Sequence, residues 1–215
     1  MKPYAAYAIG AALVDTEIQV TDAELAAMNV EKGMMTLVDQ ARQRDMLTTL
    51  SDHLIRASHA SGGSAGNSMI ATAMMGAPTY MSCKVAQDAD GDIYLADLEQ
   101  SGVAHGLTDR RTDGVTGKCI VLITPDAERS LNTHLGISET LSTDEVDEAA
   151  IKDSEWVYLE GYLVTSPTGH AAALKTKALA EAHGVKTAVS FSDPGMVKFF
   201  RDNMAAMVEG GVELV

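Results

Sequence analysis

The sequence predicts an α/β fold in which a mainly parallel β-sheet is covered by helices on both faces. Apolar runs without alternation, such as residues 5–14 and 155–164, are typical of strands that are buried on both faces. Segments with helical spacing or helix-boundary residues lie between these runs. Strands that alternate with helices of this length favour crossover connections and hence a parallel sheet.

The first half of the chain contains two predicted strands and two predicted helices. Residues 5–14 and 79–85 form the strands, and residues 39–57 and 91–102 form the helices. The helix over 39–57 has one apolar stripe, which consists of Met46, Leu47, Leu50, Leu54 and Ile55.

The second half carries clearer boundary signals. Ser142 and Glu145 form a capping-box pattern that predicts a short helix over 143–152. Pro167 and Gly184 are typical of the first turn and the end of a helix between them. The remaining predicted elements are strands at 155–164 and 186–192, a helix from Asp193-Pro194 to Gly210-Gly211, and the start of a strand at 212–215.

Two regions do not fit the parallel pattern. Residues 16–22 with 34–38, and a hairpin formed by 119–124 and 130–135, look antiparallel and polar on one side. We expect them to form a small antiparallel β lid, with strands from about 16–38 and 113–135, within a single domain that spans residues 1–215.

Composition excludes several classes of protein. The formal net charge of −14 argues against a nucleic-acid partner, which requires a basic face. Cys83 and Cys119 lie in apolar stretches and are expected to be reduced core residues. No apolar stretch reaches the roughly 18 residues of a membrane span, so no membrane association and a cytoplasmic location are expected.

Residues 61–68, SGGSAGNS, directly precede an apolar helical segment. No lysine follows the glycines as in a P-loop, and Ser61 stands where a dinucleotide fingerprint needs its first glycine. A predicted helix, and not a strand, precedes the stretch. Either it is a helix start without a ligand, or its N–H groups with Ser64 and Asn67 bind a polar small molecule.

No rival chemistry is apparent elsewhere in the sequence. The histidines form no pair at metal-ligand spacing, and a G-x-S-x-G nucleophile motif is missing. The acidic run between Glu139 and Glu155 is interpreted as a solvated helix face, so no metal site is predicted.

Several stretches together resemble the PfkB carbohydrate kinase family, within the ribokinase-like superfamily, and most closely its adenosine-kinase-like branch. They occur in family order and are GAALVD (10–15), GGSAGNS (62–68), DADGDIYLADLEQSGV (88–103), TGKCIVLITPDAERSLNTHLG (116–136), EGYL (160–163) and SDPGMVKFF (192–200). The resemblance covers the whole chain but corresponds to the N-terminal part of the family, so the C-terminal part of a ribokinase-like fold is expected to be missing.

The resemblance implies transfer of the γ-phosphoryl group of ATP to a primary hydroxyl of a nucleoside or sugar. Asp15 would accept hydrogen bonds from substrate hydroxyls, and Arg129 would lie near the transferred phosphate. The other implied substrate-binding residues are Met35, Leu37, Gly62, Gly63, Ser64, Asn67, Cys119, Leu131 and Tyr162.

Each of these residues also has a purely structural interpretation. Asp15 could cap a strand end, and Arg129 could form a surface ion pair. Leu37, Leu131 and Tyr162 could be ordinary core residues.

Two departures from the family pattern affect the expected function. Ala11 stands where the family commonly has Asn, which weakens the inference of nucleoside specificity. The family's Asn/Glu motif associated with Mg²⁺ and its G-A-G-D motif, which carries the catalytic base, are absent from residues 1–215. We therefore expect these residues alone to be inactive, with most contacts to ATP and Mg²⁺ lying elsewhere.

Two further readings remain open. The chain could instead be a non-catalytic sugar- or nucleoside-binding module, and a Rossmann-type oxidoreductase is a distant third. An uncovered sheet edge would favour a homodimer or a companion C-terminal polypeptide.

Overall fold

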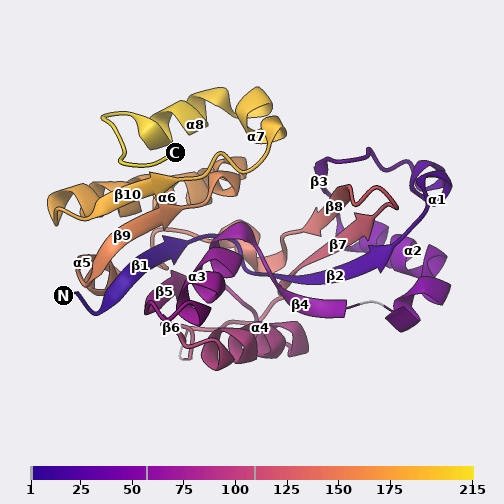
Figure 1. The fold of residues 1–215 in the computed structure, drawn as a ribbon, viewed down its shortest axis with the longest axis horizontal. Coiled ribbons are helices and arrows are strands. Elements are labelled where there is room, and N and C mark those ends of the chain that lie inside the picture. The colour runs from indigo at the N-terminus through magenta and orange to yellow at the C-terminus, as the bar shows by residue number, and fades with distance from the viewer. Residues whose placement is uncertain (1, 57, 109) are drawn as a thin grey trace.

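The computed structural model describes residues 2–56, 58–108 and 110–215, and it contains two five-stranded sheets. Figure 1 shows them side by side along the long axis of the molecule, with the parallel sheet beside the N-terminus and the second sheet at the other end. The predicted division into a parallel sheet and a lid sheet is confirmed.

The first sheet, sheet A, is parallel throughout. Its strands, in spatial order, are β10 (Lys186–Val189), β9 (Ser154–Leu159), β1 (Tyr4–Ile9), β5 (Thr79–Ser82) and β6 (Val103–His105). The short strand β6 was not predicted.

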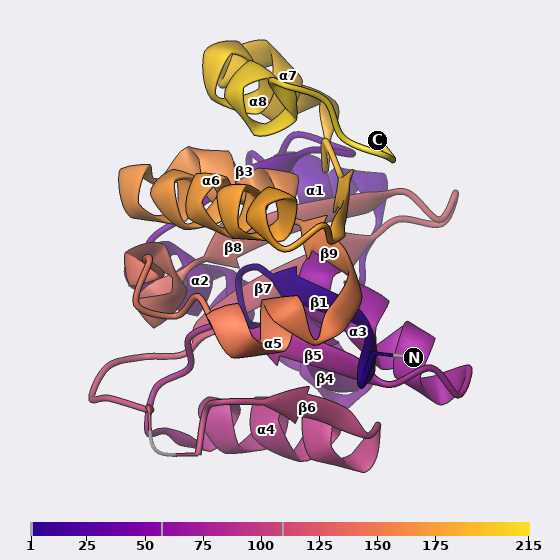
Figure 2. The ribbon, with the colours of Figure 1, turned by 90° about the vertical axis from the view of Figure 1, so that its left-hand side faces the viewer.

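Helices cover both faces of sheet A, as predicted (Figure 2). On one face, α5 (Glu148–Lys152) and α6 (Pro167–Ala182) enclose a core that includes Tyr7 and Leu159. On the other face, α3 (Ser64–Met74) and α4 (Ala89–Gln100) enclose Ala8 and Met81. Neighbouring residues of β1 thus point into different cores, which explains why its sequence is apolar without alternation.

The second sheet, sheet B, is mixed, whereas the sequence predicted an antiparallel lid. Its order is β3 (Met35–Leu37), β8 (Arg129–His134), β7 (Gly117–Ile123), β2 (Leu13–Gln19) and β4 (Ser58–Gly62). The β7–β8 hairpin is antiparallel as expected, but β2 pairs with β7 in parallel because a long connection separates the two strands.

One face of sheet B is covered by two helices. They are α1 (Asp22–Ala27), which was not predicted and begins with a capping box at Thr21, and α2 (Gln40–Thr49). The predicted helix over 39–57 continues after α2 only as a 3₁₀ helix, Ser51–Arg56. Ala57 and the side chain of Ile55 lie outside the described residues.

The apolar run 5–14 is not one strand, and this is the main correction to the prediction. Within this run, β1 ends at Ile9 and β2 begins at Leu13, so its first part lies in sheet A and its last part in sheet B. At the crossover, the amide of Ala11 donates to Glu160 and that of Ala12 donates to Ser138. Side-chain acceptors therefore replace the ladder bonds that a continuous strand would have made.

Two more predictions differ from the structure. Ser142 and Glu145 make their capping bonds, but the helix begins only at Glu148, where Asp147 caps α5. The stretch before the glycines is strand β4, and not a helix, because its backbone pairs with β2.

The C-terminal helical segment also differs from the prediction. It is split at Phe200 into α7 (Pro194–Phe199) and α8 (Arg201–Val208). In the predicted final strand, only Leu214 forms a parallel bridge, with Ala188 of β10. Among the described residues, no helix combines the length and hydropathy of a membrane span.

Candidate functional site

A cavity of about 180 Å³ lies where the inner face of sheet B meets the carboxyl ends of β1 and β9. This is the edge of a parallel sheet at which ligands usually bind. Its lining residues are Ala11, Leu13, Asp15, Met35, Leu37, Gly63, Ser64, Asn67, Cys119, Arg129, Leu131, Thr133, Leu135, Glu160, Tyr162 and Thr165.

The structure brings the predicted site residues together. All of them except Gly62 line this one cavity, although they come from sheet B, from the start of α3 and from the 3₁₀ helix Gly161–Thr165. Gly62 lies directly behind Asp15, where it contacts the carboxylate and not the open space.

Asp15 is the central polar group on the side of sheet B. It lies in β2, level with Cys119 of β7 and Ala60 of β4. Burial raises the pKa of Asp15 to about 6, and the positive charge of Arg129 partly opposes this shift. Within the described part of the chain, no side chain or amide donates a hydrogen bond to this carboxylate, so it can accept from a ligand.

Two glycines shape the cavity beside Asp15. A Cβ atom on Gly62 would lie 2.0 Å from Asp15 Oδ1, so any side chain there would displace the carboxylate. Gly63 has φ +88° and would place a Cβ 2.3 Å from the carbonyl oxygen of Ala11. Glycine is therefore required at both positions, for space and for backbone conformation respectively.

Glu160 is the main site residue that sequence analysis missed. It follows β9, is fully buried (0 % exposed) and lines the cavity. Its carboxylate accepts hydrogen bonds from Ala11 N (2.8 Å), Ser64 Oγ (2.6 Å) and Ala65 N (3.1 Å). An acidic residue at the end of an apolar strand, within EGYL, was the available signal.

The alternation of β8 could have identified further lining residues. Arg129, Leu131, Thr133 and Leu135 are spaced by two and share the cavity face. Only the first two were predicted.

The apolar part of the lining is contributed largely by sheet B. Met35 and Leu131 are neighbours across β3 and β8, and the side chain of Leu37 is 47 % exposed. A large apolar residue left half exposed on a cavity wall is suited to contact with a flat or apolar ligand surface.

Cys119 and Tyr162 are placed in the lining but are poor ionisable catalysts. Burial raises the pKa of Cys119 to about 12, so its thiol stays protonated at neutral pH. Burial and the nearby carboxylate of Asp193 also raise the pKa of Tyr162. Both side chains therefore act as neutral parts of the wall.

Arg129 lies at the mouth of the cavity. Its Nη2 is 3.1 Å from Oε1 of Glu17, and their side chains are 51 % and 43 % exposed. The residue thus both lines the cavity and forms a surface ion pair, so the two sequence interpretations are compatible.

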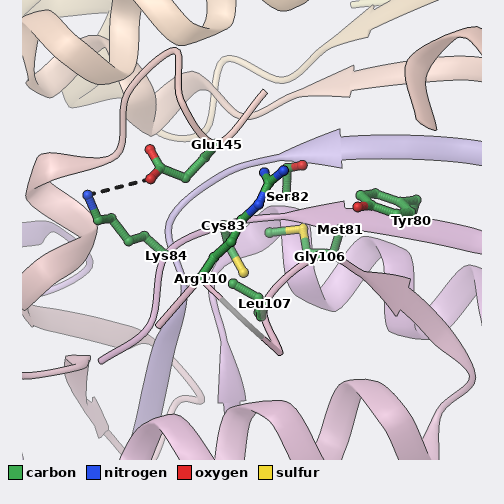
Figure 3. A pocket seen from close by; sticks show the side chains of 9 residues that line it. All are labelled: Tyr80, Met81, Ser82, Cys83, Lys84, Gly106, Leu107, Arg110 and Glu145. Carbon is green, nitrogen blue, oxygen red and sulfur yellow. Dashed lines mark ion pairs between the residues drawn. The ribbon is translucent and has the colours of Figure 1, made fainter. Parts of the chain in front are cut away.

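A second, smaller cavity of about 20 Å³ lies at the carboxyl end of β5 (Figure 3). Lys84 and Glu145 face each other across its edge, 3.5 Å apart. This volume holds about one water molecule and not a sugar ring. Of these two cavities, the one beside Asp15 has the room for such a ring and contains the predicted site residues, so it is the candidate ligand site.

The part of the chain that the structure describes contains no group of three or more His, Cys, Asp or Glu side chains placed to hold a metal ion.

Two solved structures share the fold described above. A probable sugar kinase from Rhizobium etli CFN 42 aligns with TM-score 0.90 and 29% identity over 98% of this chain and 63% of its own. The adenosine kinase from Sinorhizobium meliloti aligns with TM-score 0.89 and 31% identity over 97% of this chain and 62% of its own.

Sequence comparison agrees. Mouse (Mus musculus) ribokinase is 27% identical over 126 residues, which are 59% of this chain and 38% of that protein. The chain thus spans less than two thirds of the length of these relatives. The model of the pfkB family of carbohydrate kinases matches residues 32–215, and the chain belongs to that family.

Proposed function

We propose that residues 1–215 form the substrate-binding portion of an ATP-dependent kinase that phosphorylates a primary hydroxyl of an adenosine-like nucleoside or a sugar. The observation that carries the proposal is the cavity in which the Asp15 carboxylate, without a hydrogen-bond donor among the described residues, faces the start of α3. Family membership and the sugar and nucleoside kinases among the relatives support the same reaction class.

The two kinds of lining group suit the two parts of such a ligand. A carboxylate can accept hydrogen bonds from two adjacent hydroxyl groups, and these charge-assisted bonds are strong. Met35, Leu37 and Leu131 offer an apolar surface for a base or a sugar face. Asn67, at the start of α3, adds a side chain that can both donate and accept.

ATP and Mg²⁺ are implied by the family, but the described residues do not fit them. No described acidic cluster is arranged to bind a metal ion, and the glycine-rich stretch lacks the lysine of a P-loop. We propose that these groups are bound mainly by residues other than 1–215. On this proposal residues 1–215 alone do not turn over ATP.

A non-catalytic binding module is the second candidate. The observation in its favour is that residues 1–215 supply a ligand cavity lined by sheet B, by the start of α3 and by the segment after β9. The two candidates predict the same ligand and differ only in phosphoryl transfer.

Isothermal titration calorimetry with adenosine, ribose and fructose tests ligand binding, with Asp15→Ala as the matched variant. We expect one of these ligands to bind and Asp15→Ala to weaken its binding by about 1.5–3 kcal/mol, the scale of a charged hydrogen bond. Equal affinity of both proteins would contradict the role of Asp15. An ADP-release assay on residues 1–215 supplemented with a polypeptide that carries the family's G-A-G-D motif then separates a kinase from a binding module. Turnover by residues 1–215 alone would refute the proposed inactivity.

A further inference from the structure

A third cavity, here called the outer groove, lies on the other face of sheet B and has a volume of about 410 Å³. Lys118 of β7 and His134 of β8 line it. Their neighbours Cys119 and Thr133 line the cavity beside Asp15. Because successive residues of a strand point to opposite faces, sheet B itself separates the two cavities. The rest of the lining is Gln40, Gln43, Arg44, Leu47 and Thr48 of α2, Leu54 of the following 3₁₀ helix, and Val115.

The charge of the outer groove is opposite to that of the chain. The chain has 30 acidic residues and 16 Lys or Arg, yet the lining includes Arg44, Lys118 and His134 and no acidic residue. Within the described residues, the guanidinium of Arg44 has no ion-pair or hydrogen-bond partner. Lys118 pairs with Asp90 of α4 at 2.5 Å, but its side chain is still 41 % exposed. Both cations are therefore able to meet an anionic group that enters from solvent.

Gln43 supplies a polar group with a fixed orientation. It is 4 % exposed, and its Nε2 donates to the carbonyl oxygens of Lys118 and Asn132, each at 2.9 Å. Both hydrogen atoms of the amide are used, so the amide cannot turn over without losing two bonds. Its Oε1 accepts from no described donor and is not sealed off from solvent. A ligand in the outer groove can therefore donate a hydrogen bond to this oxygen.

The remaining lining is largely apolar. Leu47 packs only in part on the core beneath α2, and Leu54 is 37 % exposed. Val115 adds a third aliphatic side chain from the segment that leads into β7. An apolar wall with a few polar groups at fixed positions, in a volume of about 300–1,000 Å³, is the usual composition of a small-molecule site. An inorganic ion would leave the apolar wall unused.

We propose that the outer groove binds a small organic anion with an apolar body, of the class of aromatic carboxylates, sulfonates and phosphate esters. Its anionic group lies at Arg44 and Lys118, and its body lies against Leu47 and Leu54. This site is on the opposite face of sheet B from Asp15, so the inference does not rest on the proposed kinase function. It assigns a second ligand to the protein.

A pair of fluorescent probes tests the proposal on residues 1–215. 8-Anilinonaphthalene-1-sulfonate (ANS) has the proposed chemistry, and N-phenyl-1-naphthylamine is the same apolar body without the sulfonate. We expect ANS to bind saturably, and Arg44→Gln to weaken its binding by about fivefold or more. Lys118→Gln should act in the same direction. The affinity for the neutral probe should change by less than about twofold in both variants.

Arg201→Gln is the matched control. Arg201 is exposed at the start of α8, so the variant removes one positive charge outside the outer groove. It should change the affinity for ANS by less than about twofold, because solvent and salt screen a distant surface charge. Leu47→Ala removes part of the apolar wall instead, and it should weaken the binding of both probes by about threefold or more.

Four results would overturn the inference. The first is that ANS does not bind saturably. The second is equal weakening of ANS binding by Arg44→Gln and Arg201→Gln, which would indicate long-range attraction only. The third is equal weakening of both probes by Arg44→Gln. The fourth is a larger effect of Arg129→Gln than of Arg44→Gln on ANS, which would indicate binding in the cavity beside Asp15. None of these results depends on whether Leu47→Ala folds.

Discussion

The two walls of the cavity are held in different ways. On the side of sheet A, Ser64 and Glu160 bond to each other and to backbone amides. On the side of sheet B, Leu37 is half exposed and Asp15 has no donor within the described chain. One wall thus satisfies its polar groups within the described chain, whereas the other keeps a carboxylate and an apolar side chain open to the cavity.

The largest effect is expected from a substitution in the wall on the side of sheet A. Glu160→Ala leaves two buried amides and a hydroxyl without their acceptor, and each such group costs about 1–3 kcal/mol. We expect the free energy of unfolding in urea to fall by about 3 kcal/mol or more. Glu155→Ala, at an exposed position of the preceding strand β9, is the control and should change the free energy of unfolding by less than about 0.5 kcal/mol.

A substitution in the wall on the side of sheet B should affect ligand affinity more than the free energy of unfolding. Gly62→Ala forces a methyl group onto the Asp15 carboxylate, so we expect affinity for the ligand to fall by about 100-fold and stability by about 1–3 kcal/mol. Gly76→Ala, at a left-handed position with open space around it, should lower stability but not affinity. Equal effects of both variants on calorimetric affinity would contradict a steric role for Gly62.

The raised pKa of Asp15 should make the stability of the ligand-free protein depend on pH. Its folded pKa of about 6 exceeds the ordinary value of 3.8, so the folded state holds this proton more tightly than the unfolded state. The stabilisation from the protonated form is therefore lost as pH rises from about 4 to about 6.

Asp15→Asn removes the titrating group at this position. The difference between this variant and the unmodified protein therefore reports on Asp15 and not on the other acids. The melting temperature of Asp15→Asn minus that of the unmodified protein should increase between pH 4 and pH 6 and stay constant above about pH 7. A difference that is flat over this range would show that Asp15 is already stabilised as an anion.

The smallest expected effect is at the mouth of the cavity. Arg129 pairs with Glu17 at the surface, so Arg129→Ala should change the free energy of unfolding by less than about 1 kcal/mol. If Arg129 binds the transferred phosphate, the variant should weaken binding of AMP more than binding of adenosine. Equal weakening of both ligands would leave Arg129 as a surface ion pair only.

Local signals were sufficient for much of the fold. The boundary residues of α6 are those predicted, with Ser166 capping the helix and Pro167 in its first turn. The β7–β8 hairpin also agrees, because its turn and its two strands are close in sequence. These elements depend on interactions within a few residues.

The errors share a different cause. Nothing in the uniformly apolar run 5–14 indicates a break, since the break is made by Glu160 and Ser138, which are far away in the sequence. Strand β4 has small polar residues and is a strand because β2 provides its partner. The resemblance to a family supplied the lining residues, whereas Glu160 needed the folded contacts to be noticed.

The crossover between β1 and β2 also has a mechanical consequence. Ala12 receives a hydrogen bond from the Ser138 hydroxyl at its carbonyl and donates one back from its amide, and Ala11 is tied to Glu160. These bonds tie the crossover to two distant segments of the chain. In any rotation of sheet B relative to sheet A that kept them, the crossover would move least, and β3 and the turn between β7 and β8, at the far end of sheet B, would move most.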